Sequence, residues 1–145
     1  MLPAGRRAGK IVTAWGLSTG DLKQSCRVCR DSAEARRLWG CEGPAKRPVY
    51  SIDCPACSGR DCPSCDGRGF VEYYECPNRV ADAGAHEAIE LFFLMKNGIL
   101  PAAGGWYDQT IGFCAAMRFL SRLDAERERR EFERAKRSSS GRGRR

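Results

Sequence analysis

Cysteine is the residue type whose spacing in this sequence most clearly indicates a chemical role. Eight of the nine cysteines stand between positions 26 and 76, and six of these form Cys-x-x-Cys pairs. Zinc takes four soft ligands in a tetrahedron, and a Cys-x-x-Cys turn presents two thiolates to one ion with little strain. Eight thiolates complete two all-cysteine sites, so the sequence predicts two zinc ions as the cofactor. The expected ligands are Cys26, Cys29, Cys41, Cys54, Cys57, Cys62, Cys65 and Cys76.

The residues around the two central pairs fit metal-binding turns. Pro55 and Pro63 each follow a cysteine and restrict φ, which lowers the conformational entropy of the unbound loop. The glycines after the second cysteines, Gly59, Gly67 and Gly69, allow tight turns that bring backbone N–H groups toward the sulfurs. These features favour metal ligation over redox chemistry, which would place a reactive thiol at a helix N-terminus.

The spacing leaves open which cysteines share an ion. The spacer 58–61 between the central pairs is short for both turns to close on one metal, which favours an interleaved arrangement. In that arrangement Cys26 and Cys29 complete one site, and Cys41 and Cys76 complete the other. An alternative for Cys41 or Cys76 is an ordinary buried thiol.

Two residues outside this set bear on the ligands. His86 is the only histidine and could replace one of the single cysteines, although surface exposure or core packing is the simpler interpretation. Cys114 lies in an apolar stripe and is most simply a buried core thiol. An iron–sulfur cluster in place of zinc is a further alternative.

The stretch from Cys54 to Cys76 resembles the cysteine-rich zinc region of J-domain (DnaJ-type) chaperones, whose units run Cys-x-x-Cys-x-Gly-x-Gly. Residues 62–69 fit such a unit, including the spacing to Cys76. The chain departs from the family at Arg79, where a partner for Cys76 would stand, and it has no His-Pro-Asp tripeptide. The resemblance therefore implies a zinc-binding hairpin and not the stimulation of an ATPase.

A second resemblance concerns the segment from Gly98 to Gln109, which is similar to a segment of small phage or prophage proteins, some encoded beside tail genes. It implies a phage or prophage setting, with a role in tail assembly or as a virion accessory. The residues also have a packing interpretation, because Gly104 and Gly105 permit a tight reversal and Trp106 can fill the space between two helices.

Several kinds of catalytic site are missing from the sequence. One histidine leaves few ways to build a general base, and the phosphate-loop, Gly-x-Ser-x-Gly and His-Glu-x-x-His motifs do not occur. A catalytic zinc keeps an open coordination position, whereas an all-cysteine site is normally closed and structural. We therefore expect a protein that is not an enzyme.

The net charge of +7 is concentrated at the ends of the chain. Residues 1–10 and 134–145 carry nine basic side chains and no acidic one, which leaves a net charge of −2 on 11–133. A solubilising basic tail and a nucleic-acid-binding arm both fit this distribution. The first 20 residues lack the apolar run of a secretory signal, so a cytoplasmic location is expected, in the host cytoplasm or the virion if phage-encoded, with no membrane association.

Composition divides the chain into four regions, and together they predict a small metal-stabilised α+β fold. The regions are a flexible leader (1–24), a cysteine-rich zinc-binding module (25–78), a helical region (79–137) and a disordered basic tail (138–145). Zinc-binding turns with a short hairpin should precede a helical hairpin and a long C-terminal helix. The expected elements are a short helix at 31–39 with Leu38 and Trp39 in the local core, a strand at 69–75, and a helix from Asp82 to Gly98. A further helix of about 25 residues should follow, capped by Asp108. The last part of this helix, 124–137, should be a charged, solvated extension.

These features lead to one functional expectation and two alternatives. The expected function is a zinc-binding adaptor or assembly protein that contacts a protein partner, such as a phage structural protein, through exposed helix surface. The alternatives are a zinc-finger nucleic-acid-binding protein that uses the basic termini, and a thiol-dependent chaperone acting through the central cysteine pairs.

Overall fold

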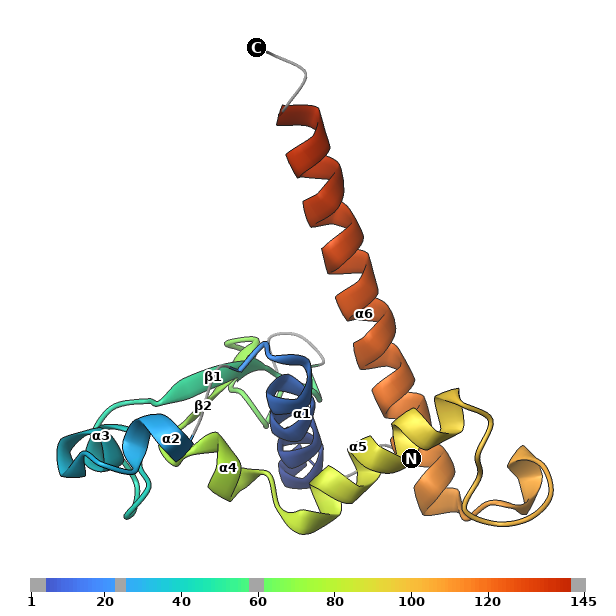
Figure 1. Cartoon of the computed structure of the whole chain (residues 1–145), viewed down its shortest axis with the longest axis horizontal. Helices are drawn as coiled ribbons and strands as arrows, with labels where there is room; N and C mark the ends of the chain where they lie inside the picture. Colours follow the sequence, from blue (N-terminus) through green and yellow to red (C-terminus); the bar gives the residue numbers. More distant parts are fainter. Residues whose placement is uncertain (1–4, 23–25, 58–61, 142–145) are drawn as a thin grey trace.

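Six helices, a short 3-10 helix and one two-stranded sheet make up the part of the chain that the computed structural model describes, residues 5–22, 26–57 and 62–141 (Figure 1). The fold is thus a small α+β arrangement, as expected from the sequence. The elements are α1 (Gly5–Thr19), α2 (Cys26–Cys29), α3 (Ala33–Leu38), β1 (Tyr50–Asp53), β2 (Phe70–Tyr73), α4 (Pro77–Val80), α5 (Ala83–Lys96), the 3-10 helix η1 (Trp106–Asp108) and α6 (Ile111–Gly141).

Helix α1 lies in the middle of the structure and supplies much of its core (Figure 1). Its buried Ile11 and Trp15 pack with residues of α5 and α6, and the Trp15 ring meets Phe92 edge to face at 5.6 Å. Leu120 of α6 is fully buried in the same cluster. The flexible leader predicted over 1–24 is therefore wrong for Gly5–Thr19, which form a helix with one apolar face that the other helices cover, while 1–4 and 23–24 lie outside the described residues.

A short antiparallel hairpin packs on another side of α1. Tyr50 and Tyr73 are paired across β1 and β2, and their rings stack at 4.9 Å. The Thr13 hydroxyl of α1 lies 3.1 Å from the Tyr50 hydroxyl, and a Cβ atom on Gly9 would collide with the Tyr73 hydroxyl. The lack of a side chain at Gly9 thus lets the helix approach the sheet closely. The strand predicted at 69–75 is confirmed as β2.

Helix α5 begins and ends as predicted. The Asp82 carboxylate accepts a hydrogen bond from Ala85 N at 3.0 Å, which is an N-cap contact, and Gly98 has a φ of 80° just after the helix. The predicted cap of α6 is wrong. Thr110 caps it instead, through a 3.2 Å hydrogen bond from Phe113 N to its hydroxyl, while the Asp108 carboxylate accepts from Gly105 N across η1.

The C-terminal end of α6 extends away from the remaining elements (Figure 1). Its charged side chains pair along the helix, as in the 2.8 Å contacts of Arg129 with Glu126 and Glu133, so the solvated extension predicted there is confirmed. The disordered tail predicted over 138–145 is wrong for 138–141, which belong to α6, and 142–145 lie outside the described residues.

The short helix α3 contributes no buried residue. Its position between Cys29 and Cys41 and its end before Gly40 agree with the prediction. Leu38, however, is 67% exposed, so its expected place in a local core is wrong. No helix in the described ranges is long and apolar enough to cross a bilayer.

Two phenylalanines provide a test of where the core lies. Phe92 is 1% exposed and Phe132 is 71% exposed. We expect Phe92→Ala to lower the free energy of unfolding by about 3–5 kcal/mol, because it removes a ring from the core and leaves a cavity. Phe132→Ala should change it by less than about 0.5 kcal/mol. Urea unfolding followed by circular dichroism measures both, and equal midpoints for the two variants would show that the core is placed wrongly.

Candidate metal centre

The loop between the two strands of the hairpin carries four of the predicted ligands. Cys54 directly follows β1, and the turn from Cys62 to Cys65 lies shortly before β2. The ends of the loop meet at a 2.8 Å hydrogen bond from Cys54 N to Gly69 O, next to the Asp53–Phe70 strand pair. The pairing of the strands therefore fixes both ends of the loop.

The same turn occurs twice in this loop. Cys57 N donates to Cys54 O at 3.2 Å, and Cys65 N donates to Cys62 O at 3.3 Å. After the second turn the chain reverses through positive φ angles of 73° at Gly67 and 80° at Gly69, as predicted for these glycines. The prediction for Gly59 lies outside the described residues. Two equal turns can thus present their sulfurs to each other.

The four sulfurs of this loop form a compact group. Each lies within 4.8 Å of the other three; Cys54 Sγ is 3.8 Å from Cys62 Sγ, and Cys57 Sγ is 4.0 Å from Cys65 Sγ. A zinc ion bound at 2.3 Å to each of four sulfurs requires a sulfur–sulfur distance of about 3.8 Å. The donor set and its dimensions therefore fit a tetrahedral thiolate site, which we call the hairpin site.

The grouping differs from the interleaved arrangement that the spacing favoured. The two central pairs share one site, so the prediction that each recruits ligands from elsewhere is wrong. The physical reason is that each Cys-x-x-Cys turn already reverses the chain, and strand pairing holds Cys54 close to Gly69. The short spacer 58–61 then has only to join two turns that face each other.

The surroundings of Cys54 disfavour a reactive thiol. Burial raises the pKa of Cys54 to about 12, and the neighbouring Cys65 and Cys62 thiols act in the same direction. A redox or nucleophilic Cys-x-x-Cys motif requires the opposite, a thiol pKa near or below neutrality. A bound divalent cation would instead lower the thiol pKa, since coordination to a metal deprotonates a thiol.

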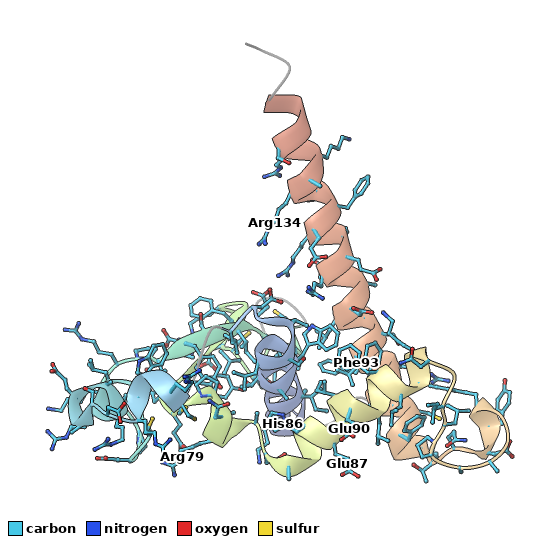
Figure 2. The ribbon with its side chains drawn as sticks, in the orientation of Figure 1. Arg79, His86, Glu87, Glu90, Phe93 and Arg134 are labelled. Atoms are coloured by element: carbon cyan, nitrogen blue, oxygen red, sulfur yellow. The ribbon has the colours of Figure 1, made fainter. Side chains whose placement is uncertain are left out.

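The remaining predicted ligands lie elsewhere. Cys26, Cys29, Cys41 and Cys76 line a separate cavity beside α2, α3 and α4. His86 is exposed on α5, outside the hairpin site, which agrees with the simpler interpretation of this residue (Figure 2).

The ninth cysteine is also outside the hairpin site. Cys114 is half-buried on α6 and its thiol donates to Trp106 O at 3.6 Å. The prediction of a buried core thiol is therefore wrong, because Cys114 lines a surface groove and is not part of the core cluster.

Two structural features of the hairpin site were missed in the sequence. Strand β1 was not recognised, although Tyr50 and Ile52 alternate with polar residues in the way that indicates a strand. The second feature is the 3.0 Å ion pair between Arg130 of α6 and Asp53, the residue before Cys54. No local signal could have revealed this contact, because the two residues are distant in the sequence.

Comparison with known proteins adds no relative to this picture. No protein-family model matches the chain, and the searches of curated proteins and of solved structures find no match. The resemblances to the J-domain chaperone zinc region and to phage proteins therefore stay predictions, and function is argued from the site.

Metal binding at the hairpin site can be tested with one substitution and a matched control. We expect Cys65→Ser to remove one equivalent of zinc and to lower the thermal midpoint by 10 °C or more, about 2 kcal/mol or above, because it breaks a closed ligand set that supplies folding energy. Cys114→Ser should keep the full metal content. Elemental analysis and thermal melts measure the two effects, and unchanged zinc in Cys65→Ser would contradict the assignment.

Proposed function

We propose that this chain is a non-enzymatic, zinc-stabilised adaptor or assembly protein. The observation that carries the metal part of the proposal is the set of four thiols within 4.8 Å of one another at the hairpin site. Four thiolates fill a zinc coordination shell, so the ion would have no open position for substrate or water. Zinc in this site would serve structure, as the two four-residue strands alone are too short for a stable hairpin.

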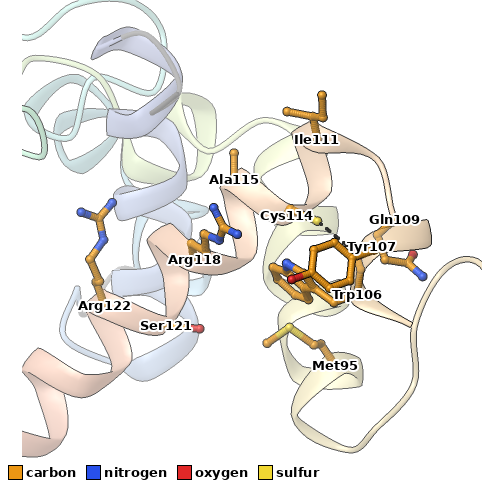
Figure 3. A pocket seen from close by; sticks show the side chains of 10 residues that line it. All are labelled: Met95, Trp106, Tyr107, Gln109, Ile111, Cys114, Ala115, Arg118, Ser121 and Arg122. Carbon is orange, nitrogen blue, oxygen red and sulfur yellow. Dashed lines mark hydrogen bonds between the residues drawn. The ribbon is translucent and has the colours of Figure 1, made fainter. Parts of the chain in front are cut away.

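The adaptor part of the proposal is supported by an apolar groove that none of the eight predicted metal ligands lines. Met95 of α5, residues of η1 and the first turns of α6 form it, and Figure 3 shows Tyr107 beside Trp106 and Ile111 at the far end of the groove. Tyr107 is 100% exposed and Ile111 is 85% exposed. Large apolar side chains left this open are typical of protein interaction surfaces.

The chemistry of the groove favours a particular kind of partner. The Arg118 guanidinium lies 5.9 Å from the centre of the Trp106 ring, and Arg122 stands one turn further along α6 on the same groove (Figure 3). An apolar side chain could cover Trp106 while a carboxylate next to it pairs with Arg118. The partner we propose is thus a protein segment with an apolar anchor flanked by acidic residues.

The biological setting we propose is that of a phage or prophage, in tail assembly or as a virion accessory. It rests on the resemblance of the Gly98–Gln109 segment, of which Trp106, Tyr107 and Gln109 line the groove. The adaptor proposal does not depend on it, because the groove and its charges stand on their own.

The two alternative functions have less support. Arg127, Arg129 and Arg130 of the α6 extension pair with glutamates of the same helix at 2.8–2.9 Å, which reduces the positive charge that this part of the helix offers to a nucleic acid and leaves the alternative to the basic end from Arg134 onward. A thiol-dependent chaperone would need a low thiol pKa, and burial raises that of Cys54.

Crosslinking from the groove tests the adaptor function. A photoreactive amino acid at position 107 should give a discrete adduct with a protein encoded by a neighbouring gene when the two are co-expressed. Arg118→Glu in the same chain should weaken binding about tenfold, because it places a carboxylate where the partner's carboxylate would sit. The yield of the adduct measures this loss.

Position 132 is the matched control, since Phe132 is also an exposed aromatic residue of this chain. It should give no discrete adduct. Equal adducts from both positions, or an adduct at 107 that Arg118→Glu leaves unchanged, would contradict a specific groove. Binding of nucleic acid that disappears with moderate salt and with deletion of 134–145 would favour the nucleic-acid alternative instead.

A further inference from the structure

A second set of four cysteines meets outside the hairpin, where α2, α3 and α4 come together (Figure 1). Cys26 and Cys29 are the first and last residues of α2, Cys41 follows α3, and Cys76 directly precedes α4. All four line one cavity. Segments separated by as many as 50 positions therefore bring their thiols to one place.

Backbone contacts hold Cys41 next to Cys76. Gly40 has a φ of 62°, and a Cβ atom there would lie 2.5 Å from Tyr74 O and 3.0 Å from Glu75 Cα. Only a glycine lets the chain before Cys41 pack this closely against the chain before Cys76. Arg79 adds a second link, because its Nη1 donates to Cys41 O at 2.9 Å.

The four cysteines differ in how far they are buried. Cys41 is half-buried. Cys29 is 4% exposed and Cys76 is 3% exposed, whereas Cys26 is exposed and accepts a 3.6 Å hydrogen bond from Asn78 Nδ2. The set thus has two buried thiols, one half-buried thiol and one exposed thiol at its open side.

The charges around this cavity suit a metal–thiolate centre. Arg27, Arg30 and Arg36 line it together with the four cysteines. A divalent ion with four thiolates carries a charge of about −2, and nearby cationic groups and N–H donors stabilise such a centre. A cation held by neutral ligands would be repelled by these arginines, so their presence disfavours that kind of site.

We propose that Cys26, Cys29, Cys41 and Cys76 bind a second zinc ion, in a site separate from the hairpin site and open on the side of Cys26. This extends the proposed zinc-binding function to a second ion with a different role. The hairpin site joins two turns of one loop, whereas this ion would fasten α2 to the start of α4. Each thiol loses its proton to solvent as its bond to the metal forms.

The second site should exchange its metal more readily than the first. Among the described residues, the hairpin group is the cysteine set whose sulfurs all lie within 4.8 Å of one another, so the second set must close further when it binds. Cys26 is exposed as the first residue of a four-residue helix, and moving its thiol toward the others would break only the 3.6 Å contact with Asn78 Nδ2. An open site with one exposed ligand gives a chelator easier access to the ion.

Titration of the reduced full-length chain with Co²⁺ tests the proposal, because tetrahedral thiolate–cobalt centres absorb visible light. We expect two equivalents for the unmodified chain and for Cys114→Ser, and one equivalent for the pair Cys41→Ser and Cys76→Ser. The pair Cys57→Ser and Cys65→Ser should also retain one, at the second site. In the zinc-loaded chain, a chelator should release one ion at least tenfold faster than the other.

Alkylation of the zinc-loaded chain followed by mass spectrometry covers the case in which a variant fails to fold. Protection of Cys26, Cys29, Cys41 and Cys76, lost together on chelation, is the expected pattern. One equivalent of Co²⁺ that needs Cys57 and Cys65 but not Cys41 and Cys76 would overturn the second site and leave the hairpin site intact. No bound metal in any form would overturn both, and a disulfide within the second set would overturn that site alone.

Discussion

The close approach of α1 to the hairpin is the contact on which the arrangement of the two halves depends. On one side of α1, the missing side chain of Gly9 and the hydroxyl of Thr13 let the helix lie against the stacked Tyr50 and Tyr73. On the other side, Trp15 enters the core formed with α5 and α6. One helix thus joins the cysteine-rich half to the helical half, and the hairpin with its loop is held at a defined place.

Sequence reasoning succeeded where the signal is local. The cap at Asp82, the left-handed Gly98, and strand β2 each follow from a few neighbouring residues. It failed where two neighbouring residues could each play the same role. Thr110 and Asp108 are both good caps, and the choice between them depends on η1, which the sequence did not reveal. The helix at 5–19 was missed because its apolar positions Ala8, Ile11 and Trp15 stand among glycines and arginines that weaken the pattern.

The candidate site shows the same division between local and distant information. The spacing of the cysteines predicted metal ligation, but it did not predict how the sulfurs group, because the grouping depends on how turns and strands place them. Loop length suggested interleaving, yet the hydrogen bond between Cys54 and Gly69 brings the loop ends together and makes the short spacer sufficient. Spacing limits which ligands can meet, and the backbone between them decides which do.

The proposed metal sites and the proposed interaction groove would have complementary physical roles in this chain. The core comes from a few apolar residues of α1, α5 and α6, and the cysteine-rich half contributes little to it beyond the small cluster of Val71 with Cys54, Cys62 and Cys65. A polypeptide half without an apolar interior needs another source of rigidity, and thiolate–metal bonds supply free energy of folding that such a half cannot gain from packing.

The groove at Tyr107 lies on the half that has the core, so the surface that would bind a partner does not need the metals to hold its shape. The metals would instead rigidify the half that faces away from it, and the Arg130–Asp53 ion pair is the direct link from the α6 extension to that half. Loss of metal should accordingly alter the hairpin and α2 to α4 first and leave the helical core folded.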